Sequence, residues 1–341
     1  YFHANIKGRR RRNQIVHLKK GDVWIQGVAE IKEEVKDNFS RHFSEEWSNR
    51  PFLQGIEFNT LSADDNALLL EPFYEEEVKE TVWSCDGNKS PGPDNFNTNF
   101  LKACWPIVKN DVMAFLQEFH DNACLPKALT ASFLTPIPKK DHPQDLFDYR
   151  PICLIGSLYK ILSKLLANRL KRVLEKLISN CQSAFLPQRQ IFYGVVVLNE
   201  IIDLAKRRKD DCLLFKGDFE RAYDTVSWLE EDRDKETPYL LFLFLIVAEG
   251  LAGLMRKAVE IGRFKGYSVN DDIQFQILQF ADDTILMGEG SWDNIRTIKT
   301  LLRSFELVSS LKINFVKSKF YGLNVDSRLL EAGSSFLSCR S

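Results

Sequence analysis

The alternation of apolar and polar positions predicts a chain in which helices and strands are mixed. Residues 159–178 have the clearest helical pattern, because five leucines at helical spacing form one apolar stripe with Lys and Arg residues between them. Similar spacing predicts helices at residues 31–47, from about residue 75, at residues 100–119 and around residues 295–305.

Shorter apolar runs predict strands at residues 133–140, 212–215 and 312–321, the last as a strand pair. Residues 48–72 carry few regular signals and are interpreted as a linker. The longest apolar run, residues 239–248, is shorter than the ~20 residues that cross a bilayer, so it predicts a buried helix and no membrane partner. Because strands and helices do not alternate in regular βαβ units, the pattern favours an α+β fold.

The most informative interruption is the sequence Phe280-Ala281-Asp282-Asp283, which separates two short apolar runs. A polar break between strand-like runs predicts a β-hairpin with both carboxylates at its tip. Adjacent carboxylates repel each other, so folding alone does not explain them, whereas a bound hard cation such as Mg²⁺ would. A plain polar turn is the alternative. It is the preferred interpretation for the other adjacent Asp pairs, at residues 64–65, 210–211 and 271–272, which lack strand-like runs on both sides.

A further carboxylate, Asp218, follows the strand predicted at residues 212–215. If that strand neighbours the hairpin, then Asp218, Asp282 and Asp283 meet at adjacent strand ends. Three such carboxylates could hold two Mg²⁺ ions about 4 Å apart, the arrangement that clamps the attacking and leaving oxygens of a phosphoryl transfer.

Charge is informative only at the start of the chain. The 341 residues, 44% hydrophobic and 27% charged, suffice for about two globular domains, and the net charge of −1 indicates no particular partner. The first 20 residues, however, contain seven Lys or Arg and no acid, including the run Arg9, Arg10, Arg11 and Arg12. Such a run predicts nucleic-acid binding, with a solvated arm or a localisation signal as the alternative.

The cysteines and histidines are not spaced as zinc ligands. The seven cysteines include no Cys-x-x-Cys pair, and the five histidines show no zinc-ligand spacing. With no signal peptide at Tyr1, we expect reduced thiols and an intracellular protein.

Taken in order along the chain, these features resemble the reverse transcriptase of plant LINE-type (non-LTR) retrotransposons. Residues 217–226, GDFERAYDTV, resemble the first aspartate motif of that family, and residues 280–284 resemble the second, with Phe280 where Tyr is commoner. Tyr1-Phe2-His3 and the arginine run resemble the stretch before the polymerase, and residues 89–94 resemble the SPGPDG element, with Asn95 in place of its last Gly. Residues 137–140 and 148–152 resemble the fingers motifs, and residues 182–187 and 189–191 resemble the block that follows them. Asn314, Lys317 and Ser318 resemble the strand block after the hairpin.

The resemblance implies an incomplete right-hand polymerase of fingers and palm, with an antiparallel palm sheet and no thumb. It implies copying of an RNA template from a DNA primer with deoxynucleoside triphosphates, in the nucleus, and leaves the oligomeric state open. The cofactors would be two Mg²⁺ ions, with Mn²⁺ as the alternative, held by Asp218, Asp282 and Asp283. The expected divisions are residues 1–75 (basic segment and linker), 76–210 (fingers), 211–325 (palm) and 326–341 (a truncated tail).

The same resemblance implies roles for four further residues. Tyr223 would lie under the incoming sugar and exclude a 2′-hydroxyl. Lys139 and Arg150 would contact the triphosphate, Arg150 through its planar guanidinium, and Lys317 would approach the same site. From the residues alone, core packing is the alternative for Tyr223, and a surface salt bridge is the alternative for Lys139 or Arg150. Asp224 is expected to be a structural partner.

One block of the family is missing. Between the two aspartate motifs the family carries a block around QGDPLSP, but here Trp228 is followed by the charged residues 229–238 and then by the apolar run. Tyr193 also stands where the family has Asp, and Gln188 and Ser310 replace expected glycines. Because the missing block supports nucleotide and template, its loss favours an inactive protein. Three possibilities stay open: a working polymerase, an inactive nucleic-acid-binding protein, and a remnant without function, including the product of a mis-spliced gene.

Overall fold

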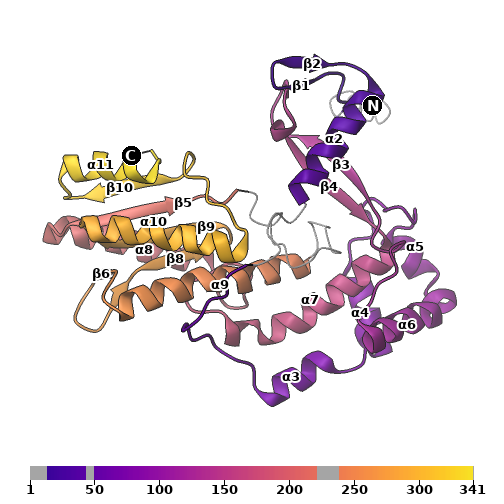
Figure 1. Ribbon diagram of the computed structural model, residues 1–341. Coiled ribbons are helices and arrows are strands. Elements are labelled where there is room, and N and C mark those ends of the chain that lie inside the picture. The colour runs from indigo at the N-terminus through magenta and orange to yellow at the C-terminus, as the bar shows by residue number, and fades with distance from the viewer. Residues whose placement is uncertain (1–13, 44–49, 221–237, 341) are drawn as a thin grey trace. The chain divides into compact units, whose positions relative to one another are not determined.

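The computed structural model describes residues 14–43, 50–220 and 238–340, which divide into two compact units (Figure 1). The first unit consists mainly of residues 14–43 and 72–165. The second consists of residues 50–71, 166–220 and 238–340.

Two antiparallel ribbons and several helices form the first unit. The ribbons are β1 (Leu18–Lys20) with β2 (Val23–Ile25), and β3 (Ser132–Pro138) with β4 (Tyr149–Ile155). The helices are α2 (Val28–Phe43), α4 (Glu75–Ser84), α5 (Thr98–Ala103), α6 (Trp105–Asn122), the 3-10 helix η1 (Leu146–Asp148) and the beginning of α7 (Ser157–Leu177).

The loop of residues 89–94 packs on the junction of β4 and α7. Asp94 Oδ2 accepts a hydrogen bond of 2.5 Å from Ser157 N, at the first residue of α7, where a carboxylate stabilises a helix. Gly92 approaches the backbone so closely that a Cβ there would lie 2.2 Å from the carbonyl of Ile155. The Ser-Pro-Gly-Pro-Asp sequence is therefore explained by the way this loop fits against β4 and α7.

A four-stranded antiparallel sheet forms the centre of the second unit. Its order is β10 (Lys319–Leu323), β5 (Cys212–Gly217), β9 (Asp283–Glu289), β8 (Ile277–Phe280). The second unit also contains a two-stranded antiparallel ribbon, formed by β6 (Tyr267–Ser268) and β7 (Gln274–Phe275). The helices are α3 (Ala63–Leu70), the rest of α7, α8 (Ile191–Arg208), α9 (Pro238–Glu260), α10 (Trp292–Ser309) and α11 (Ser327–Leu337).

The two faces of this sheet pack against different helices. Phe215, Leu286 and Phe320 belong to the main core, together with apolar residues of α9 and α10. The alternating residues Leu214 and Met287 point to the other face, because successive strand residues point to opposite sides, and there they join a cluster with α8.

The apolar sequence of helix α9 is explained by the burial of this helix in the main core. Its segment Tyr239–Glu260 is the one described segment long and apolar enough to cross a membrane by length and composition alone. However, 67% of the 18-residue apolar stretch within that segment is buried, and Phe244 and Leu251 are fully covered. Gly253 allows close approach of the chain before α3, since a Cβ there would lie 2.7 Å from the ring of Phe58. The prediction of a buried helix is confirmed, although the helix is longer than the ten-residue run suggested.

The predicted mixture of helix and sheet is confirmed, with several corrections. The predicted linker, residues 48–72, contains α3, which begins at a capping box between Ser62 and Asp65. The single helix predicted at residues 100–119 is divided into α5 and α6 at Cys104. The strand pair predicted at residues 312–321 is one strand, β10, because residues 314–318 form a turn instead.

Candidate active site

Three aspartates lie at one end of the central sheet. Asp218 directly follows β5, and Asp282 and Asp283 lie where β8 turns into β9. The ladder between β5 and β9 ends with the pair Gly217 and Thr284, so the next residues outward, Asp218 and Asp283, lie at the same end of two neighbouring strands. The structure therefore confirms the predicted hairpin and places the three aspartates at the same end of neighbouring strands.

The backbone of Asp218 is held by the turn before β10. Asp218 N donates to Ser318 Oγ over 3.1 Å, and Asp218 O accepts from Asn314 N over 2.7 Å. Ser318 Oγ in turn donates to Asn314 O over 2.8 Å, and Ser318 is buried. These hydrogen bonds fix the position of the Asp218 backbone, and therefore of the Cα from which its carboxylate extends.

Charge is concentrated and partly neutralised at this end of the sheet. Burial raises the pKa of Asp218 above its ordinary value; Lys317 opposes this rise, and the charges of Asp282 and Asp283 add to it. Lys216 Nζ lies 2.8 Å from Asp283 Oδ1, and this hydrogen bond raises the pKa of Lys216. The carboxylates thus share one electrostatic environment with two lysines.

Lys216 was not singled out from the sequence. The signal that could have found it is its position two residues before Asp218, which places both on the same face of an extended strand. This is the face covered by α8 further along the sheet. At the aspartate end the face is accessible, since the side chains of Lys216 and Asp283 are 47% and 55% exposed.

A buried glutamine holds the tip of the hairpin. Ala281 has φ +54°, which is uncommon for a residue other than glycine. Gln182 Oε1 accepts hydrogen bonds of 3.0 Å from both Ala281 N and Ala184 N, and its Nε2 donates to Ala281 O over 3.4 Å. Gln182 is 1% exposed and forms a bridge to Gln279 of β8. The resemblance included Gln182 without giving it a role, and the structure makes it the support of the turn that carries Asp282.

Lys139 and Arg150 lie close to each other along the β3–β4 ribbon of the first unit. Ile137 pairs with Arg150 across β3 and β4, and Lys139 N continues the ladder by donating to Asp148 O over 2.7 Å. Lys139 and Arg150 therefore share one face of the ribbon. Lys139 Nζ donates to Phe147 O over 2.8 Å, and Arg150 is exposed. Their predicted contact with a triphosphate stays a prediction.

Some predicted site residues lie outside the described residues. These are Tyr223, Asp224 and the run Arg9, Arg10, Arg11 and Arg12. Within the described ranges, no group of three or more His, Cys, Asp or Glu side chains has the spacing of a metal site. The roles of Asp218, Asp282 and Asp283 as metal ligands stay predictions.

Comparison with known families identifies the class of protein. The model of the family described as reverse transcriptase (RNA-dependent DNA polymerase) matches residues 137–240. That segment includes Lys139, Arg150 and Asp218 and ends before the Asp282 hairpin. The chain therefore carries a reverse transcriptase domain.

Several relatives are proteins of transposons or retrotransposable elements, and this chain is similar to them over more than half of its length. It is 26% identical over 238 residues to the transposon TX1 uncharacterized 149 kDa protein of Xenopus laevis, covering 67% of this chain and 18% of that protein. It is 24% identical over 253 residues to the retrovirus-related Pol polyprotein from type-1 retrotransposable element R1 of Bradysia coprophila, covering 66% and 25%. It is 27% identical over 212 residues to the probable RNA-directed DNA polymerase from transposon BS of Drosophila melanogaster, covering 58% and 23%. The chain thus spans no more than a quarter of the length of these relatives.

Proposed function

We propose that this chain supplies fingers and palm of a right-hand polymerase whose ancestral reaction is RNA-templated DNA synthesis. The supporting observation is that Asp218 lies beside Asp282 and Asp283 at the ends of neighbouring strands, in a chain of the reverse transcriptase family. Residues 211–325 correspond to the palm in this proposal, and residues 76–210 to the fingers.

The donor chemistry of the site fits divalent cations. Asp218, Asp282 and Asp283 offer only carboxylate oxygens, the ligands that Mg²⁺ prefers, and Mn²⁺ accepts the same donors. Two bound ions would stabilise charge on the attacking 3′-hydroxyl oxygen and on the leaving oxygen. Asp283 would have to exchange its bond to Lys216 for an ion, and the backbone bonds of Asp218 would keep its carboxylate at the site.

The proposed substrates are an RNA template, a DNA primer and deoxynucleoside triphosphates. Arg150 and Lys139, which share one face of the β3–β4 ribbon, would bind triphosphate oxygens, and Tyr223 would select the sugar. Lys317, whose charge acts on Asp218, would attract phosphate to the carboxylates.

We further propose that the protein with this sequence has lost the ancestral activity and binds nucleic acid without copying it. The reason lies in the missing block between the aspartate motifs, which leaves the carboxylates without the segment that positions template and nucleotide. A working polymerase is the alternative, and primer extension distinguishes the two.

Ion binding should depend on the clustered aspartates. We expect Mn²⁺ titration by calorimetry to show a site whose affinity falls by about tenfold or more in Asp282→Asn, since an amide supplies one neutral donor oxygen where a carboxylate supplies charge. Asp272→Asn is the matched control, because it removes one carboxylate from another Asp pair, in the exposed turn between β6 and β7. Equal affinity in the two variants, or no binding by the unaltered chain, would contradict the proposed site.

A further inference from the structure

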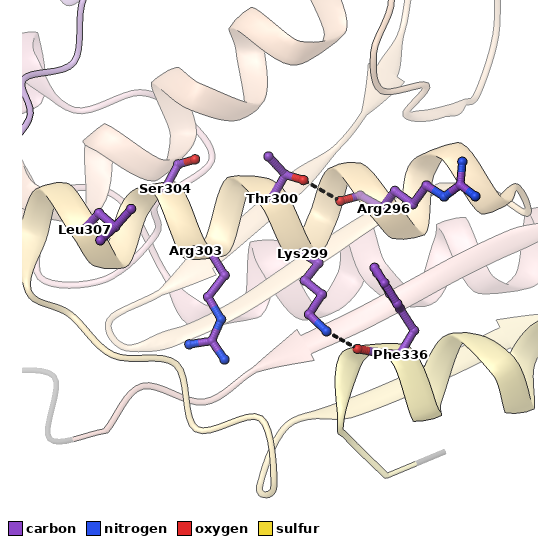
Figure 2. A pocket seen from close by; sticks show the side chains of 7 residues that line it. All are labelled: Arg296, Lys299, Thr300, Arg303, Ser304, Leu307 and Phe336. Carbon is purple, nitrogen blue, oxygen red and sulfur yellow. Dashed lines mark hydrogen bonds between the residues drawn. The ribbon is translucent and has the colours of Figure 1, made fainter.

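A basic groove lies on the outer side of α10, next to the end of α11 (Figure 2). It has a volume of about 510 Å³, and its lining includes Arg296, Thr300 and Arg303, which share one side of α10, together with Lys299 and Phe336. Figure 2 shows Lys299 and Arg303 extending from α10 toward the end of α11, where the Phe336 ring lies beside Lys299.

The three cations outnumber the acids that neutralise them. Arg303 Nη1 lies 2.5 Å from Glu306 Oε2, and Arg296 Nη1 lies 4.0 Å from Asp293 Oδ1. Lys299 Nζ donates to the uncharged carbonyl of Phe336. The Arg303 and Arg296 side chains remain 57% and 63% exposed, so both can approach a ligand from solvent.

An exposed aromatic ring lies beside these basic side chains. Lys299 Nζ lies 4.2 Å from the centroid of the Phe336 ring, which is 37% exposed, and the ring of Trp292 lies 5.5 Å from it. Basic side chains along a groove with an exposed aromatic ring are the two components that bind single-stranded nucleic acid, by phosphate pairing and base stacking.

We propose that this groove binds a single-stranded nucleic acid, with phosphates on Arg296, Lys299 and Arg303 and a base on Phe336. Lys299 Nζ, which lies over the Phe336 ring, would move from the ring to a phosphate when the base stacks there. The site is separate from the three aspartates. The inner side of α10, with Ile298 and Phe305, packs on the sheet face opposite to that of Lys216 and Asp283, and the groove lies on the outer side of α10. It would hold a second stretch of nucleic acid, whether or not the chain extends a primer.

The test is binding of a fluorescent 12-nucleotide oligouridylate to the full chain at increasing salt. In the triple variant Arg296→Gln, Lys299→Gln, Arg303→Gln, we expect the slope of log affinity against log salt to become shallower by about 2, because each phosphate contact on a single strand contributes about 0.7. The matched control Lys206→Gln, Arg207→Gln, Arg208→Gln removes the same charge from the exposed last turn of α8 and should leave most of that slope intact.

The contribution of base stacking on Phe336 to the binding affinity can be measured separately. Phe336→Leu should weaken binding at least about fivefold without changing the salt slope, because stacking is lost and charge is kept. Ultraviolet cross-linking should attach the oligouridylate to the tryptic peptide of residues 329–340. Since Arg303 also stacks on Phe315, the double variant Arg296→Gln, Lys299→Gln checks that loss of binding does not come from altered packing, and it should keep about two thirds of the slope change.

Three results would overturn the proposal: equal losses in the α10 and α8 triple variants, unchanged binding in the α10 variant, or polyglutamate competing as well as the oligonucleotide. The last result would indicate a surface that recognises negative charge alone. A DNA oligonucleotide of the same length distinguishes the source of the strand: equal binding indicates recognition of phosphate and base, and weaker binding indicates preference for RNA through its 2′-hydroxyl. Both of these results support the proposed groove.

Discussion

The chain with this sequence should give no measurable primer extension on an RNA template with Mg²⁺ and all four deoxynucleotides. Holding reactants in near-attack geometry contributes roughly 7–11 kcal/mol, and the missing block between Trp228 and Tyr239 is what would position template and nucleotide. Asp218, Asp282 and Asp283 would bind ions even without that geometry in our proposal, so carboxylates alone are not expected to suffice.

Restoring the missing block provides the positive arm of this experiment. A chain in which residues 229–238 are replaced by the QGDPLSP-containing segment of a related retrotransposon should extend the primer, and adding Asp282→Ala should abolish extension. If the unaltered chain extends a primer and Asp282→Ala stops it, the shortened palm is active and our proposal of lost activity is wrong.

Replacing Gln182 by Ala should loosen the hairpin that carries Asp282. The substitution removes the acceptor of both Ala281 N and Ala184 N in a buried site, and each unsatisfied group costs about 1–3 kcal/mol. Ala281 also has a positive φ that its neighbours must maintain. We expect amide exchange of residues 277–286 to accelerate by about 100-fold, equivalent to roughly 3 kcal/mol of local stability.

Hydrogen exchange with mass spectrometry measures this effect directly. Gln274→Ala, a change of the same residue type at an exposed position of β7, should leave exchange in residues 277–286 unaltered. Gln182→Met keeps the side-chain length without the acceptor and should behave like Gln182→Ala. Slow exchange in Gln182→Met would mean that Gln182 acts by filling space and that its hydrogen bonds are unimportant.

Local patterns predicted the hairpin and the helices with a clear apolar stripe. The runs on either side of Ala281 form β8 and β9, because short alternating segments around a polar break have few other solutions. The leucine stripe of residues 159–178 forms α7, and Ile295 to Phe305 lie on α10. On α10 the periodic residues Ile295, Ile298, Leu302 and Phe305 are all buried. On α7 the agreement is partial, because Leu162 and Leu174 are buried while Leu166, Leu170 and Leu177 are half-buried.

Other elements could not be predicted because tertiary contacts decide them. Helix α8 has exposed apolar residues at its start, such as Phe192 and Val196, which blur the helical pattern, and its buried face forms only against Leu214 and Met287. Helix α11 is short, and its apolar side is defined by packing on α10 and β10. The extent of β10 depends on pairing with β5, which residues 312–318 do not show locally.

The candidate site divides in the same way. The aspartates could be found because adjacent carboxylates beside apolar strands have a chemical explanation and a family resemblance. The aspartates and their hairpin are supported by Lys216, Ser318 and Gln182, through contacts between residues roughly 70 to 100 positions apart in sequence. Local sequence patterns cannot predict contacts over such separations.

Crystal diffraction from the full chain soaked in Mn²⁺ tests the central claim most directly, because the anomalous signal locates the ion independently of any activity. We predict a Mn²⁺ peak bridging Asp218 and Asp282, with the Asp283 carboxylate released from Lys216, and its loss in Asp282→Asn crystals. An ion bound instead at Asp271 and Asp272, or no ion near Asp218 at saturating Mn²⁺, would contradict a shared carboxylate site at the ends of β5 and β9.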